Sequence, residues 1–241
     1  MALYVCGDLH TPIDIHKLNT TQFPEQKQMT KEDLVIALGD FGGVWYPEGH
    51  NKYSEDRYWQ KWLKDKKFTF CFVDGNHENF ELLNTFPIIE KWGGKVRDVN
   101  GLYQLLRGEI YEIQGKRILT IGGAESHDRA SRTEGVSWWP QETVSYPEQE
   151  NTLKNLDRYN NKVDYILTHT CPSSVAYKVA GYCHISVFNS YCNSQIPHTE
   201  KFLEHVRAIT KFKEWHFGHW HVDYDDGTFY CHYNCKPHKL I

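Results

Sequence analysis

Five segments of the chain share one design, in which a short run of apolar residues ends in a loop that carries aspartate, asparagine or histidine. The loops are Gly7-Asp8-Leu9-His10, Gly39-Asp40, Gly75-Asn76-His77-Glu78, Thr168-His169 and Gly218-His219-Trp220-His221. A single Gly-Asp pair after a strand is most often a turn. The repetition carries more weight, because the groups that carry out chemistry in open α/β sheets sit at the carboxyl ends of buried strands. The design therefore predicts a sheet protein with its functional groups at the strand ends.

The order of the predicted elements favours an α/β fold. Strands at 3–6, 33–38 and 68–73, with an amphipathic helix at 54–67 between two of them, indicate parallel pairing. Short β-prone pieces then follow at 102–106, 109–113 and 117–121, as expected for a hairpin or a meander. The remaining predicted elements are helices at 151–160 and 199–209 and strands at 163–167, 215–217 and 228–233.

The segment 124–147 is the least regular part of the chain. It contains Arg129, Arg132 and the pair Trp138-Trp139, and long irregular segments in compact domains are usually functional or disordered. The tryptophans indicate order, so we expect this segment to cap the active site, with the two arginines contacting a phosphate group of the substrate and a tryptophan offering a face on which a base could stack. Alternatively, the tryptophans pack the segment onto the body and the arginines pair with nearby acids. The chain shows no internal repeat or linker, and a single domain over residues 1–241 is predicted.

The composition is that of an ordinary soluble globular protein. Hydrophobic residues make up 40% and charged residues 24% of the 241 positions, and the net charge of −4 favours a small substrate over long duplex nucleic acid. No apolar run is long enough to cross a bilayer, and Asp8 interrupts the first one too early for a signal peptide. The odd number of cysteines, seven, suggests reduced thiols. These features predict a cytoplasmic protein without membrane contact.

The five loops together offer carboxylate oxygen, amide oxygen and imidazole nitrogen, and no thiolate. This ligand set suits divalent ions such as Mn²⁺, Fe²⁺ or Zn²⁺. Two such ions about 3.5–4 Å apart can generate a hydroxide at neutral pH and clamp the attacking and leaving oxygens of a phosphoryl group. A carboxylate shared by both ions would hold that spacing. Histidines elsewhere, such as His127 and His216, are expected to be ordinary structural or surface residues.

In this order, the five loops resemble the motifs of the calcineurin-like metallophosphoesterase superfamily, over residues 7–221. The resemblance implies an α/β sandwich of two mixed β-sheets flanked by helices. It also implies that Asp40 bridges two metals and that His77 faces the substrate as the catalytic residue. Glu78 is expected only to favour the start of the following helix. The implied ligands are Asp8, His10 and His221 for one metal, and Asn76, His169 and His219 for the other.

The same resemblance implies a phosphoesterase that uses a metal-bridging hydroxide and two divalent ions, either Mn²⁺ or Fe²⁺, with Zn²⁺ and Ni²⁺ as alternatives. The chain departs from the Ser/Thr protein phosphatases, because Thr11 follows His10 and Phe41-Gly42-Gly43 follows Asp40. The arginine that grips phosphate in that branch, and the aspartate that orients its histidine, are absent from the second loop. We therefore favour a phosphodiesterase acting on nucleotides or nucleic-acid ends. The alternatives are a Ser/Thr-type protein phosphatase and a non-catalytic scaffold of the same fold.

Overall fold

The first sheet contains the N-terminal strands and ends with an antiparallel edge on either side. The structure is a computed structural model that describes residues 1–234 and 236–241. Four strands run parallel and adjacent, namely β1 (Leu3–Cys6), β2 (Leu34–Leu38), β3 (Thr69–Val73) and β6 (Leu102–Leu105). Antiparallel strands β5 (Gly94–Val99) and β4 (Ile88–Lys91) extend one side, and β13 (His238–Lys239) pairs with β1 on the other. The sheet is therefore mixed, with a parallel centre.

The second sheet has the same plan. Its parallel centre is formed by β8 (Lys116–Ile121), β9 (Tyr165–Thr168), β10 (Glu214–Phe217) and β12 (Phe229–Cys231). Antiparallel strands β7 (Ile110–Ile113) and β11 (Tyr224–Asp225) form its edges. Within each sheet the parallel strands end on the same side. The loops that carry functional side chains are expected on that side.

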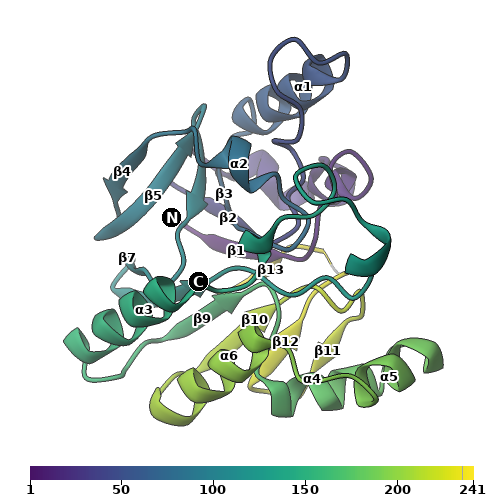
Figure 1. Cartoon of the computed structure of the whole chain (residues 1–241). Coiled ribbons are helices and arrows are strands. Elements are labelled where there is room, and N and C mark those ends of the chain that lie inside the picture. The colour runs from purple at the N-terminus through teal and green to yellow at the C-terminus, as the bar shows by residue number, and fades with distance from the viewer. Residues whose placement is uncertain (235) are drawn as a thin grey trace.

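The two sheets pack face to face, with helices on their outer faces (Figure 1). A shared core of side chains such as Val5, Ile36 and Leu167 lies between them. The outer face of the first sheet is covered by α1 (Tyr53–Lys64) and α2 (Phe80–Leu83). The outer face of the second is covered by α3 (Tyr146–Arg158), α4 (Ser173–Ala180), α5 (Ile185–Cys192) and α6 (His198–Ile209). This arrangement confirms the predicted sandwich of two mixed sheets flanked by helices.

The predicted meander is divided between the two sheets. Strands β7 and β8 form the expected hairpin, but β6 pairs with β3 and β5 in the other sheet. Gly108, in the turn after β6, has a φ of +77°, a left-handed conformation that glycine adopts without strain. The segment 106–109 therefore carries the chain from one sheet to the next.

The irregular segment is shorter than predicted, because α3 begins at Tyr146. Ser145 and Glu148 form a capping box, and Pro147 occupies the first turn, where its missing N–H costs nothing. Two short 3₁₀ turns, Arg129–Ser131 and Pro140–Glu142, lie within the remaining segment. Among the residues that the structure describes, no helix combines the length and apolar character needed to span a membrane.

Glu200 connects α6 to α5 and to the loop after β9. Its carboxylate accepts hydrogen bonds from the Tyr191 hydroxyl at 2.8 Å and from the Thr170 hydroxyl at 3.3 Å. Burial raises the pKa of Glu200 from 4.5 to about 8. The folded chain therefore holds a proton there, between these two pH values, that the unfolded chain releases.

The stability of the fold is expected to fall as the pH rises from 4.5 to 8, because a raised carboxyl pKa favours folding only while the proton is held. The slope attributable to Glu200 is at most about 1.4 kcal/mol per pH unit. Glu200→Gln cannot titrate and should remove this slope. Urea unfolding of both proteins at pH 5, 6.5 and 8 measures the difference, and equal pH dependence of the two would contradict the assignment.

Candidate metal centre

The five loops predicted from the sequence meet at one place, although they come from both sheets. Asp8 and His10 follow β1, Asp40 follows β2, and Asn76 and His77 follow β3. The second sheet contributes His169 after β9, and His219 and His221 after β10. Potential ligand atoms cluster within 4.8 Å of one another in three overlapping groups, which are Asp8 with His10 and His221, Asp8 with Asp40 and His169, and His10 with Asp40 and His77. These groups therefore contain five of the seven side chains proposed as metal ligands, together with His77.

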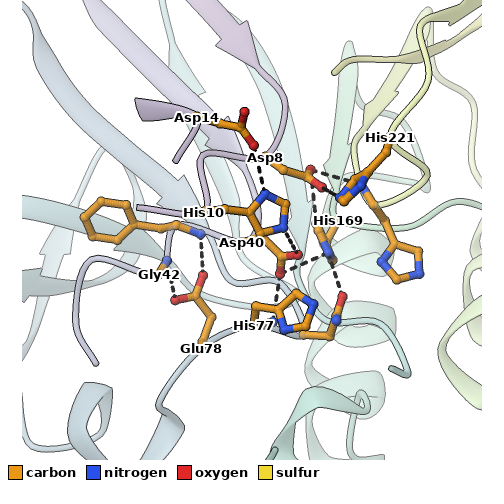
Figure 2. A network of polar contacts seen from close by, with 12 residues as sticks. Asp8, His10, Asp14, Asp40, Gly42, His77, Glu78, His169 and His221 are labelled. Carbon is orange, nitrogen blue, oxygen red and sulfur yellow. Dashed lines mark hydrogen bonds and ion pairs between the residues drawn. The ribbon is translucent and has the colours of Figure 1, made fainter. Parts of the chain in front are cut away.

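Asp40 lies at the centre of this cluster (Figure 2). Its Oδ2 is 3.1 Å from His10 Nε2, and its Oδ1 is 3.3 Å from His169 Nε2. Burial alone would raise the pKa of Asp40, but the surrounding imidazoles, His169 first, hold it well below its usual range. Asp40 is therefore an ionised carboxylate, and its Oδ2 faces His10 while its Oδ1 faces His169.

Asp8 has an oxygen whose bonding needs are not met by the described residues. Its Oδ1 accepts a hydrogen bond from the His219 N–H at 3.0 Å. Its Oδ2 is buried, forms no hydrogen bond and lies 3.1 Å from His221 Nε2. A buried carboxylate oxygen without a hydrogen bond is costly. A cation between Asp8 and His221 would satisfy it, so this part of the site fits a bound metal.

Asn76 and His169 turn donor atoms toward the same space. The Asn76 amide nitrogen donates to Ser126 Oγ at 3.1 Å, which leaves its Oδ1 facing His169 Nε2 at 3.0 Å. His169 Nδ1 donates to the Leu38 carbonyl at 2.8 Å, which fixes the ring with Nε2 toward the cluster. The ring of His219 lies 5.0 Å from that of His169, and burial lowers the pKa of His219 well below its usual value. These three side chains are therefore grouped on one side of the cluster, where they could hold a metal.

Four of the proposed ligands have a left-handed backbone. The φ values are +36° for His10, +45° for Asp40, +67° for His219 and +52° for His221. Left-handed residues other than glycine are uncommon and each costs on the order of 1–3 kcal/mol when strained. The tight turns at the strand ends impose this conformation, and it directs several side chains inward from short loops.

Two glycines of the motifs leave room for the carboxylates. A Cβ atom on Gly75 would lie 2.0 Å from Asp40 Oδ1, and one on Gly218 would lie 2.1 Å from Asp8 Oδ1. No larger residue fits without displacing these oxygens. The glycines of the sequence motifs therefore serve close approach as well as turn formation.

His77 and Arg132 lie next to each other at the edge of the cluster. Arg132 Nη2 is 3.3 Å from His77 Nε2, and Arg132 Nε donates to Asp128 Oδ1 at 2.6 Å. Burial lowers the pKa of His77, and the positive charge of Arg132 adds to the effect. Arg129 lies elsewhere, with its guanidinium 3.8 Å from the centre of the Trp138 ring. Only one of the two predicted substrate arginines thus contacts the proposed catalytic histidine.

The two tryptophans of the irregular segment are packed against the body. Trp138 is 5% and Trp139 is 2% exposed, and Trp139 contacts the Trp45 ring edge-on at 5.4 Å. Neither presents a free face for a base. The tryptophans therefore pack the segment onto the body of the protein, which was the alternative prediction. Arg132 pairs with an acid, as that alternative also predicted, and in addition contacts His77.

Two acids that were not predicted as part of the site support the cluster. Glu78 is fully buried, and its carboxylate accepts hydrogen bonds from the N–H groups of Phe41 at 2.7 Å and Gly42 at 3.2 Å. Asp14 Oδ2 lies 3.2 Å from His10 Nδ1 and orients that ring (Figure 2). Glu78 thus secures the turn that follows Asp40, beyond the helix-start role expected of it. The spacing His10-x-x-x-Asp14 was a usable signal, but the burial of Glu78 had none.

A cavity of about 410 Å³ opens beside the cluster and is lined by Asp40, Asn76, His77 and His219, together with His127. The His127 ring stacks on His219 with 5.4 Å between centroids. His127 therefore belongs to the wall of the site, although its sequence context gave no sign of this.

Comparison with known proteins agrees with this geometry. A family model described as calcineurin-like phosphoesterase matches residues 1–223. Lariat debranching enzyme A of Xenopus laevis is 28% identical over 188 residues, which cover 73% of this chain and 34% of the relative. The chain thus spans about a third of the length of that curated relative.

Proposed function

The chain belongs to the calcineurin-like phosphoesterase family, and from that premise we propose that it hydrolyses phosphate esters with two divalent metal ions. Asp8, His10 and His221 would hold one ion, and Asn76, His169 and His219 the other. Asp40 would contribute one oxygen to each. When bound, such ions polarise the phosphoryl group and lower the pKa of water to near neutral.

The observation that carries this proposal is the pair of carboxylates at the centre of the cluster. Asp40 is ionised and faces His10 and His169 with different oxygens. Asp8 has a buried oxygen without a hydrogen bond. Two carboxylates surrounded by imidazoles in this way form a preorganised cation site. Oxygen and nitrogen donors without thiolate favour Mn²⁺ or Fe²⁺, with Zn²⁺ or Ni²⁺ as alternatives.

We propose that His77 faces the substrate and stabilises the leaving oxygen by hydrogen bonding or proton donation. Its backbone N–H donates to Asp40 Oδ1 at 2.8 Å, so the main chain is tied to the cluster while the ring remains at the cavity wall. Arg132 beside the ring would contact a non-bridging phosphate oxygen. We further propose that the rest of the segment 124–147 forms a cap that holds Arg132 in place.

A phosphodiester of a nucleotide or a nucleic-acid end is the substrate class that we favour. The name of the Xenopus relative, lariat debranching enzyme, supports this choice. The second loop, Phe41-Gly42-Gly43, lacks the arginine and aspartate expected of a Ser/Thr protein phosphatase. The alternatives to be distinguished by experiment are a Ser/Thr-type protein phosphatase and a non-catalytic scaffold.

The test combines metal analysis with hydrolysis assays. The purified chain is stripped of metal and reconstituted with Mn²⁺, Fe²⁺, Ni²⁺ or Zn²⁺. It is then assayed with bis(p-nitrophenyl) phosphate and p-nitrophenyl phosphate. We expect two ions per chain and faster hydrolysis of the diester. Preference for the monoester would favour a phosphatase, and inactivity with every metal would favour the scaffold.

Arg132 and Arg129 form a matched pair for testing substrate contact. Arg132→Ala is expected to raise KM about 10- to 100-fold, because it removes a charge-assisted hydrogen bond to the phosphate. Arg129→Ala should change KM less than about twofold, since that guanidinium lies over Trp138. Metal content should stay the same in both. Steady-state kinetics and metal analysis of both variants measure these effects. Equal changes in KM for the two substitutions would refute the proposal that Arg132, and not Arg129, contacts the phosphate.

A further inference from the structure

A second cavity reaches the cluster from the other side of His77. It has a volume of about 350 Å³ and is lined by His10 and Thr11 at its inner end and by Trp45, Tyr46 and Trp59 further out. His77 lines both this cavity and the one of about 410 Å³ described above. The proposed catalytic histidine therefore stands between two separate spaces, each large enough for a small-molecule group.

Two tryptophans and a tyrosine line the second cavity, whereas the first is lined by Trp220 and several histidines. Trp45, Tyr46 and Trp59 are each only half-buried, so part of every ring remains accessible. Lys52, which is exposed, stands at the same cavity with its Nζ 5.6 Å from the Tyr46 ring centre. Aromatic faces beside a cation suit a planar base attached to a phosphate.

The loop that carries Trp45 and Tyr46 is held in place by hydrogen bonds to its backbone. The N–H groups of Trp45 and Tyr46 both donate to Asp56 Oδ2 of α1, at 2.6 and 2.7 Å. The Asn79 side chain donates to the Trp45 carbonyl at 2.9 Å. The Trp59 ring is supported edge-on by His16 at 5.4 Å. The backbone at Trp45 and Tyr46 and the ring of Trp59 are therefore positioned before any ligand arrives, which lowers the entropy cost of binding.

We propose that this aromatic cavity binds the nucleobase of one ester group of a phosphodiester, while the other ester group enters the cavity on the far side of His77. The inference rests on the proposed function and specifies its substrate class. A phosphodiester has two substituents on one phosphorus, and the site has two cavities that meet at one histidine. A monoester would leave one of them unused.

The test uses three dinucleoside monophosphates. One is thymidylyl-thymidine, and each of the other two has one thymine replaced by hydrogen on a tetrahydrofuran sugar analogue. Base stacking on aromatic side chains predicts that one of the two abasic compounds is hydrolysed with a kcat/KM about 10- to 100-fold lower than the intact dinucleotide. Trp59→Ala and Tyr46→Ala should lower kcat/KM for the intact compound by a similar factor and leave that abasic compound unaffected.

Two further variants complete the design. Tyr177→Ala removes an aromatic ring that is 60% exposed on α4 and lines neither cavity, and it should behave as the wild type. Trp59→Phe keeps an aromatic face and should retain most of the discrimination. Equal turnover of the three compounds by the wild type, or equal losses on intact and abasic compounds in the variants, would overturn the proposal.

The proposal of a nucleobase subsite and the proposal of phosphoesterase function can be refuted independently. Hydrolysis of bis(p-nitrophenyl) phosphate without hydrolysis of any dinucleotide would refute the subsite and leave the function standing. If no ester is hydrolysed, the function fails, and saturation-transfer NMR of thymidylyl-thymidine without metal judges the subsite alone. Transfer to one thymine methyl that disappears in Trp59→Ala supports it, and no transfer in the wild type overturns it.

Discussion

Asp40→Asn is expected to lower the metal content below two ions per chain and to reduce kcat about a thousandfold, since the metals supply several kcal/mol of transition-state stabilisation. An amide offers one oxygen, whereas both oxygens of Asp40 face imidazoles. The amide nitrogen would replace an acceptor on one side of the cluster, so at least one ion loses a ligand. The fold should persist, because asparagine tolerates the left-handed φ of +45° at this position.

Metal analysis and kinetics on the same preparations measure this effect. His10→Ala should mainly weaken one of the two ions, which separates a bridging ligand from a ligand to a single metal. Asp65→Asn is the matched control, because that carboxylate is 61% exposed at the end of α1 and pairs only with Lys61 among the described residues. An Asp40→Asn variant with two tightly bound ions and full activity would refute the metal centre as proposed.

His77→Ala is expected to reduce kcat about 10²- to 10⁴-fold on esters with alkyl or nucleoside leaving groups, which need a proton or a hydrogen bond to depart. The loss should be far smaller on bis(p-nitrophenyl) phosphate, because p-nitrophenolate leaves without help. Metal content should be unchanged, since the bond from His77 to Asp40 comes from the backbone N–H.

The dependence on the leaving group separates a catalytic role from a structural one. A purely structural loss would lower activity on both kinds of ester by the same factor. His205→Ala, at an exposed position on α6, controls for removal of an imidazole. Equal losses on the two esters in His77→Ala would assign His77 to support of the cluster instead of proton transfer.

The elements with strong local signals were predictable from the sequence. Strands such as Leu34–Leu38 are buried throughout and bounded by glycine, so apolar run length identified them. The strand Ile88–Lys91 was not predicted, because its side chains are largely exposed at a sheet edge and show no alternation. Helix Ile185–Cys192 was missed for a similar reason, since Ile185 and Val187 are exposed and its contact with the core is limited to a short stripe that includes Phe188 and Tyr191. The sheet to which Leu102–Leu105 belongs depends on long-range pairing that no local pattern encodes.

The candidate site was likewise predictable from the sequence only in part. The side chains that converge on Asp40 were predicted because each lies in the loop that directly follows a strand. Glu78 was misjudged because its role depends on complete burial against the turn at Phe41, which only the tertiary structure reveals. Arg129 and Arg132 could not be distinguished from the sequence, whereas the structure places the Arg129 guanidinium over the Trp138 ring and Arg132 beside His77.

The left-handed residues at the cluster also limit which substitutions can stabilise this protein without loss of the site. At His10, His219 and His221, glycine would relieve backbone strain but would remove an imidazole from the cluster. Stability and the proposed activity therefore oppose each other at the same positions. Thermostabilising design of this protein should accordingly leave these turns alone and draw its gains from the outer helices.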